Sequence, residues 1–302
     1  MPSGYPTNMS NIELPNEVSR EILQKTQESS TVMRLARQIA LPGRGVQIPV
    51  ITGDPTADWV SETEAKPVSN PSLSKKIMQA HKLAVIVPFS DEFRRDAASL
   101  YDALVSRLPD VLGKKFDQTV FFGPASGSLA NFDNFSAVTT QSMQSSPYAA
   151  LVAADTDIAE QSGIVNGYVF SPQGKGVLLS ALDAENRPLF INSVAEGAIP
   201  RLLGSPTYVT SAAYKDGTAT VGTTPGDPDI IGFAGDWTKA MYGTVEGVRI
   251  SYSADASLVV GSGTTQYTLN LFQQNMFAVR CEIEVGFVAQ TNYFNAFTRT
   301  HT

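Results

Sequence analysis

A long β-strand near the C-terminal end is the feature that most constrains how this chain can fold. Alternate residues of the stretch are apolar, namely Phe277, Val279, Cys281, Ile283, Val285 and Phe287. The residues between them are Ala278, Arg280, Glu282, Glu284 and Gly286. Successive side chains of a strand point to opposite faces, so this order predicts a strand with one buried face. Cys281 is expected on that face as an unreactive core residue.

Two further strands are expected at residues 45–51 and 76–87, joined by a long loop rich in charged and turn-forming residues. Hairpin connections usually have roughly 2–5 residues, so a loop of this length is expected to be functional. The loop carries Trp59, one of only two tryptophans, in a polar setting. A tryptophan among charged residues is a candidate interface anchor. The alternative is that Trp59 folds back onto its own hairpin.

Helical spacing of apolar residues marks two segments outside these strands. In the first 44 residues the pattern comprises Val18, Ile22, Val32, Leu35, Ala36 and Ile39, with Ser30 or Thr31 placed to cap the later part. So small an apolar stripe needs a partner, and the segment is expected to lie as an arm against another surface. The longest helix is expected to begin after Ser90 and to end before Gly123, with a kink at Pro109.

Between these parts the chain has the pattern of a compact α/β section. Helices are expected at 148–161 and 172–182, a strand at 167–171, and short strands through 190–234.

Residues that carry enzymatic or metal chemistry are scarce. The 302 residues include one cysteine and two histidines, so neither a disulfide framework nor a four-ligand zinc site can be built. His81 is expected to be a satisfied, partly buried residue of a strand, and His301 to lie in a mobile terminal tail. We therefore predict no catalytic residue, no cofactor and no metal site.

Charge and hydropathy exclude further classes of function. With 22 basic and 29 acidic side chains the formal charge is −7, which argues against electrostatic binding of nucleic acid. No apolar run approaches the length that spans a membrane, and the N-terminus has no pattern of a signal peptide. What remains is an arm, a protruding hairpin, an unusually long helix and a long terminal strand. Each would be poorly buried in a monomer, so the sequence predicts an assembly subunit that contacts copies of itself.

Several segments resemble the tailed-phage major capsid proteins with the Hong Kong 97-like fold. The residues that carry the resemblance, in chain order, are Ile48-Pro49-Val50, Ala57-Asp58-Trp59-Val60-Ser61-Glu62, Lys82 to Glu92, Gly167 to Pro172, Asn186 to Phe190, Leu202 to Pro206, Phe277 to Ala289, and Ala296-Phe297. The match covers nearly the whole chain in one order.

The resemblance implies an α+β chain divided into five parts. These are an N-terminal arm (1–44), an extended β-hairpin loop (45–87), a first part of the peripheral domain with the long spine helix (88–146), an inserted axial α/β domain (147–237), and a second part of the peripheral domain with the long-stranded sheet (238–302).

The same resemblance implies a structural protein of the virion, assembled in the host bacterial cytoplasm. Copies would form hexamers and pentamers and close into an icosahedral shell around double-stranded DNA, without sequence-specific binding and without a membrane. Portal, scaffolding and decoration proteins are further expected partners. The predicted inter-subunit contact residues are Trp59, Glu62, Glu64, Lys66, Arg34, Arg37, Arg94 and Arg95.

Two features found in some members of that family are not expected here. The chain begins at Met1 just before the arm, so we predict a separate scaffolding protein or none. Some members also join the extended loop to a peripheral loop by a Lys–Asn isopeptide bond. Lys66, Lys75 and Lys76 could supply the amine, but residues 253–265 contain no asparagine, so we predict no cross-link.

Two other functions remain as alternatives. An encapsulin-like nanocompartment shell would have the same fold and enclose protein cargo. A β-rich hydrolase would need a pocket that brings His81 to a nucleophile.

Overall fold

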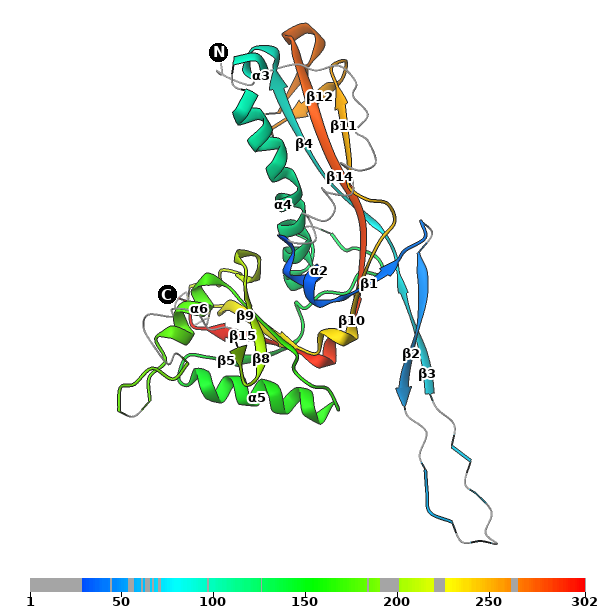
Figure 1. Ribbon diagram of the computed structural model, residues 1–302, viewed down its shortest axis with the longest axis vertical. Helices are drawn as coiled ribbons and strands as arrows, with labels where there is room; N and C mark the ends of the chain where they lie inside the picture. The colour runs from blue at the N-terminus through cyan, green and yellow to red at the C-terminus, as the bar shows by residue number, and fades with distance from the viewer. Residues whose placement is uncertain are drawn as a thin grey trace.

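The computed structural model describes most of the chain (Figure 1). The described residues are 29–43, 45–53, 57–60, 62, 66, 68–69, 72–96, 98–125, 127–183, 185–190, 201–219, 226–261 and 266–301, with side chains omitted at 51–53, 72–73, 94, 96 and 98–104. Two sheets lie one above the other in the view of Figure 1, with a long helix along the upper one and a hairpin that projects from the side. In the described residues no helix is long and apolar enough to cross a membrane.

The predicted terminal strand is the centre of the first sheet. It is β14 (Met276–Ala289), and one of its edges pairs antiparallel with β4 (His81–Ser90). Along its other edge lie β10 (Ala240–Thr244) and then β11 (Arg249–Ser253), and β1 (Arg37–Ala40) adds to β10 in parallel. A single strand thus holds three others in register, as expected of the longest alternating stretch in the sequence.

The apolar face of β14 is buried under the long helix. The two helical segments are α3 (Asp91–Asp96) and α4 (Ala98–Phe122), and Pro109 lies inside α4. Leu108 and Leu112 of α4 share one core cluster with Cys281. Burial raises the pKa of the Cys281 thiol to about 12, helped by the nearby charge of Glu282. The prediction of an unreactive core cysteine is confirmed.

The extended hairpin consists of β2 (Val46–Gly53) and β3 (Ser72–Met78), paired antiparallel. The prediction of one second strand over 76–87 is wrong, because β3 ends at Met78 and β4 begins at His81. The reason is a change of partner, since β3 pairs with β2 and β4 pairs with β14. The change of partner also changes which face of the strand is buried. Met78 is fully buried, whereas Ile77 on the opposite face is 41% exposed.

The described part of the arm is α2 (Thr31–Leu35) followed by β1. The helical pattern predicted through Ile39 is therefore wrong beyond Leu35. Residues 37–40 instead form a ladder with β10, and Ile39 packs in a cluster with Leu41. The predicted cap is confirmed, because the Ser30 hydroxyl accepts a hydrogen bond from the Met33 amide at 3.1 Å. Val18 and Ile22 lie outside the described residues.

The second sheet contains the expected α/β section. Its strands, in spatial order, are β5 (Thr139–Ser142), β15 (Phe294–Arg299), β9 (Asp229–Gly235), β6 (Gly167–Phe170), β8 (Ser205–Val209) and β7 (Arg201–Leu202). Helices α5 (Pro147–Glu160) and α6 (Pro172–Leu179) pack against it, as predicted within a few residues. The last strand, β15, belongs to this sheet, whereas the expected division at residue 238 assigned it to the part that holds β14.

The remaining elements are short. A hairpin of β12 (Ser257–Val260) and β13 (Tyr267–Asn270) packs beside β14, and single 3₁₀ turns lie at Ser211–Ala213, Trp237–Lys239, Phe272–Gln274 and Thr291–Tyr293.

Aromatic side chains join the two sheets into one core. The rings of Phe135 and Phe294 stack with centroids 4.3 Å apart, and those of Phe121 and Phe233 with centroids 4.7 Å apart. Trp237 is buried in the same cluster, and its indole N–H donates to the Gly167 carbonyl at 3.1 Å. The end of α4 is therefore packed directly on the second sheet, which fixes the sheets relative to each other.

Candidate interaction surfaces

The extended hairpin presents apolar side chains that its own chain does not cover. Trp59 has 104% of its reference surface exposed and Val68 has 89%. Glu62 and Lys66 are also exposed, whereas Glu64 lies outside the described residues. The alternative in which Trp59 folds back onto its hairpin is thus wrong for the isolated chain. An exposed tryptophan with charged neighbours is typical of an anchor that becomes buried in an assembly.

The predicted arginines lie on other elements. Arg34 of α2 is exposed, and its guanidinium lies 5.2 Å from the ring centroid of Tyr208 in β8. Arg37 in β1 and Arg95 in α3 are exposed, and Arg94 is also in α3, though its side chain is not described. Figure 1 places α3 at the far end of the molecule from the projecting hairpin. Of the eight predicted residues, those that the structure describes lie on separate elements and form no single site.

A buried carboxylate that the sequence reasoning missed holds the arm to the long helix. Asp117 of α4 is fully buried and accepts hydrogen bonds from the Ser30 hydroxyl, from the Thr31 amide at 2.8 Å and from the Val32 amide at 3.3 Å. These donors are at the N-terminal end of α2, where amides lack partners within the helix. Burial raises the pKa of Asp117 to about 7, although the three donors oppose that rise. In the sequence, the signal for this contact was an aspartate within the otherwise apolar stripe of the long helix.

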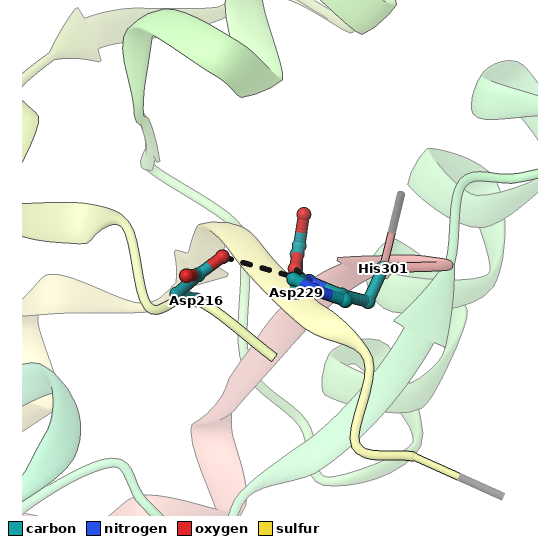
Figure 2. A group of neighbouring side chains, drawn as sticks. All are labelled: Asp216, Asp229 and His301. Atoms are coloured by element: carbon teal, nitrogen blue, oxygen red, sulfur yellow. Dashed lines mark hydrogen bonds and ion pairs between the residues drawn. The ribbon is translucent and has the colours of Figure 1, made fainter. Parts of the chain in front are cut away.

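A second missed cluster fixes the end of the chain to the second sheet. Figure 2 shows His301 pointing at Asp229, and the His301 Nδ1 atom lies 2.7 Å from Asp229 Oδ1. The expectation of a mobile tail at His301 is therefore wrong. Its ring nitrogen also lies 3.5 Å from Asp216 Oδ1.

Asp229 already has a donor for each of its lone pairs. Its Oδ1 accepts from the Gly217 amide at 2.9 Å as well as from His301, and its Oδ2 accepts from Arg299 Nε at 2.9 Å and the Tyr214 hydroxyl at 3.3 Å. Burial would raise the pKa of this carboxyl, but the donors outweigh burial and lower the pKa to about 2. Asp216, Asp229 and His301 are near enough to share a cation. Because Arg299 already neutralises Asp229, the arrangement serves as a structural anchor.

The histidines do not assemble a hydrolytic centre with the cysteine. His81 Nε2 lies 2.8 Å from the Ala130 carbonyl oxygen, and its ring meets Phe132 edge to face. The prediction that His81 is a satisfied strand residue is confirmed. His301 is engaged with carboxylates of the second sheet, and Cys281 is buried in the first.

A model of the phage capsid family matches residues 12–298. The chain belongs to the phage capsid family. Among curated members it is 25% identical over 292 residues to the probable major capsid protein gp17 of Mycobacterium phage D29, covering 91% of this chain and 86% of that one. It is 22% identical to the major capsid protein of Staphylococcus phage 80alpha, covering 90% of this chain and 80% of that one.

Solved structures from phages share the fold of this family member. A chain of Microbacterium phage Oxtober96 aligns with a TM-score of 0.71 at 20% identity, covering 99% of this chain and 96% of that one. A chain of Gordonia phage Cozz aligns with a TM-score of 0.69 at 20% identity, covering 90% and 87%. The predicted α+β, Hong Kong 97-like fold is confirmed. Curated relatives named as phage major capsid proteins do not favour the encapsulin-like alternative.

Proposed function

We propose that this chain is the major capsid protein of a tailed bacteriophage. Its copies would assemble as hexamers and pentamers into an icosahedral shell that encloses double-stranded DNA. The observation that carries the proposal is the projecting hairpin, on which the side chain of Trp59 is fully exposed. The chain that carries this hairpin belongs to the phage capsid family. A single chain gains nothing from such an exposed tryptophan, whereas a neighbouring copy can bury it.

Assembly would use surfaces at several ends of the molecule. The hairpin, with Trp59, Glu62, Glu64 and Lys66, would lie across a neighbouring copy. The second sheet would meet its own copies around the axis of each hexamer or pentamer. Arg34, Arg37, Arg94 and Arg95 would contribute polar contacts at other boundaries, where charged residues set orientation and register more than affinity.

The enclosed DNA would be confined by the shell more than bound by it. A formal charge of −7 offers little attraction to phosphate, and tight binding would hinder release of the genome. Portal, scaffolding and decoration proteins are further proposed partners, and assembly would take place in the host bacterial cytoplasm.

Electron microscopy combined with an absorbance ratio tests this function. Particles purified from infected cells should be uniform closed shells in which this chain is the most abundant protein. Their ratio of absorbance at 260 and 280 nm should be that of a nucleoprotein. Shells with the ratio of pure protein and an enzyme inside would contradict the proposal in favour of a nanocompartment.

A further inference from the structure

The direction of the extended hairpin depends on contacts at its root. The hairpin projects to the side of the body, by which we mean the two sheets together with α4 (Figure 1). A two-stranded ribbon is only marginally stable by itself in water, so it needs support from the body to hold one direction. The contacts between β3 and the body therefore decide where the exposed Trp59 is presented.

The first of these contacts is a notch in the first sheet that receives Met78, the last residue of β3. Gly243 of β10 and Gly286 of β14 are paired across the two strands and form the notch. A Cβ atom added at Gly286 would lie 2.8 Å from Met78 Cγ, and one added at Gly243 would lie 3.0 Å from Met78 Sδ. Met78 is fully buried there and packs with Leu41 and Val288. Apolar packing is not directional, so by itself this contact lets the ribbon pivot about Met78.

Lys76 makes a second attachment on the same face of β3, two residues nearer the tip. Its Nζ atom donates to Asp133 Oδ2 at 2.7 Å and to the Ala289 carbonyl at 2.6 Å. Both acceptors are themselves held in place. The Asp133 amide donates to the Phe287 carbonyl at 3.2 Å, and Asp133 Oδ2 also accepts from the Ala289 amide at 2.9 Å. The ammonium is thus bound at once to the loop after α4 and to the end of β14 by directional, charge-assisted hydrogen bonds.

The loop after α4 makes two more contacts along the connection from β3 to β4. Asn131 Nδ2 donates to Gln79 Oε1 at 3.3 Å, and His81 Nε2 lies 2.8 Å from the Ala130 carbonyl oxygen. Both contacts lie beyond Met78 on the side away from the tip. Lys76 is therefore the outermost of the three, and it is the one placed to resist rotation of the ribbon about Met78.

We propose that Lys76, through Asp133, fixes the direction in which the extended hairpin leaves the body. The two side chains are 35% and 31% exposed, and ion pairs that water reaches contribute little to the free energy of unfolding. The effect of this pair is geometric, because two attachments on one face of a strand oppose rotation about either of them. From Lys76 to Ser72 the strand extends about 13 Å further, so a small rotation at the root becomes a larger displacement toward the tip.

In a shell, this contact orients Trp59 before a neighbouring copy binds it. A hairpin that already has its final direction loses less conformational freedom on binding, which favours assembly. This consequence rests on the proposed function, whereas the direction of the hairpin is a property of the single chain. The two can therefore be measured separately.

Pulsed electron–electron double resonance on the unassembled full-length chain tests the role of Lys76. One nitroxide is attached at Val68→Cys in the loop of the hairpin and one at Ala149→Cys in α5, and both positions are exposed. The natural Cys281 is fully buried and stays unlabelled. We expect a narrow distribution of distances between the labels in this background. Adding Lys76→Met should make the distribution several-fold broader.

The matched control is Lys75→Met, which removes an exposed ammonium from the opposite face of the same strand. Motion within the hairpin loop is common to all the variants, so the control should be as narrow as the background. Thermal unfolding followed by circular dichroism should be nearly the same for both lysine variants, because the ion pair adds little stability. A narrow distribution with Lys76→Met, or equal broadening by Lys75→Met, would overturn the proposal.

Asp133→Ala tests whether Lys76 acts through this carboxylate, and it is the second variant to measure if Lys76→Met does not fold. We expect it to broaden the distribution as Lys76→Met does. Combining the two substitutions should add little further broadening, because the two residues act as a pair. A narrow distribution with Asp133→Ala, or additive broadening by the two substitutions, would overturn the assigned pairing.

Sedimentation velocity of the same variants separates this inference from the proposed function. Lys76→Met should lower the rate of shell assembly several-fold relative to Lys75→Met. Normal assembly by a Lys76→Met chain with a broad distribution would overturn the link between hairpin direction and assembly. Shells together with a narrow distribution in Lys76→Met would refute this inference alone. A broad distribution in Lys76→Met, with no shells from the unmodified chain, would refute the proposed function alone.

Discussion

At the scale of single residues, two buried carboxylates fix the ends of the described chain. Asp117 receives the beginning of α2 through three donors, and Asp229 receives His301 and Arg299 near the C-terminus. Their environments act in opposite directions on the pKa. Burial raises the pKa of Asp117 to about 7 against the effect of one hydroxyl and two amide donors, whereas the donors of Asp229 include Arg299 and outweigh burial, which lowers the pKa of Asp229 to about 2.

Replacing Asp117 should change how stability depends on pH. The folded state holds the proton of Asp117 up to about pH 7, but the unfolded state releases it near the ordinary aspartate pKa of 3.8. The stabilisation from this group is therefore complete at low pH and is lost as pH rises toward 7. Asp117→Asn cannot titrate, so the unassembled wild type should lose stability relative to this variant between pH 5 and 7.

Denaturant unfolding at several pH values measures this effect. Parallel pH profiles for wild type and Asp117→Asn would contradict it. Asp117→Ala provides a further comparison, because it leaves the Ser30 hydroxyl and the Thr31 amide without an acceptor. We expect it to cost about 1–3 kcal/mol near pH 4. Because this variant cannot titrate either, the cost should shrink as pH rises toward 7.

Replacing Asp229 should loosen the C-terminal end. Asp229→Ala removes the acceptor of Arg299, His301 and the Gly217 amide and should cost about 2 kcal/mol in thermal unfolding. Because the pKa of Asp229 is lowered in the folded state, its contribution should be present above about pH 4 and be lost as pH falls toward 2. Asp216→Ala is the matched control, since that side chain is 71% exposed, and it should change stability by less than about 0.5 kcal/mol. Equal losses for both variants would refute the anchor.

At the scale of elements, the alternation and spacing of apolar residues predicted the strands and helices where one periodicity held throughout. The strand β14 and the helices α5 and α6 were expected within a few residues. The spacing of apolar residues gave wrong predictions where the chain changes the strand with which it pairs. Ile39 continued a helical spacing but lies in β1, and one alternating run divided into β3 and β4 at Gln79-Ala80. Tertiary pairing with β10 and β14 decided both cases, and neither partner is adjacent in sequence.

The two tryptophans should respond in opposite ways to truncation. Trp59→Ala removes a fully exposed side chain and should leave unfolding of the unassembled chain within about 0.5 kcal/mol of wild type, while it lowers shell assembly strongly. Trp237→Ala removes a buried ring that packs on Phe294 and should cost about 3–5 kcal/mol. Circular dichroism measures unfolding and sedimentation velocity measures assembly. Normal assembly of Trp59→Ala at the same concentration would show that the hairpin is not an anchor.

At the scale of the whole molecule, the sequence predicted the architecture better than the sites. The order of arm, hairpin, long helix and inserted α/β section was visible in the patterning. The contacts of Asp117 with the start of α2, and of Asp229 with Arg299 and His301, were not, because each joins residues 70 or more positions apart. Contacts across such separations leave no periodic trace in one sequence. For the same reason, the sequence did not show that the predicted arginines lie on separate elements.

Assembled shells should be held together by non-covalent contacts. Residues 253–265 contain no asparagine that could react with Lys66, Lys75 or Lys76. Shells boiled in detergent should therefore run as a single band of 32.4 kDa. A ladder of covalent oligomers on the denaturing gel would contradict this prediction.

The central claim is that the projecting hairpin makes this chain a shell subunit. The most direct measurement is a cryo-electron microscopy reconstruction of particles built from this chain. We predict a closed icosahedral shell of hexamers and pentamers in which the hairpin of each copy lies across a neighbour and the side chain of Trp59 is buried there. Particles without closed symmetry, or a shell in which Trp59 remains exposed to solvent, would contradict the account.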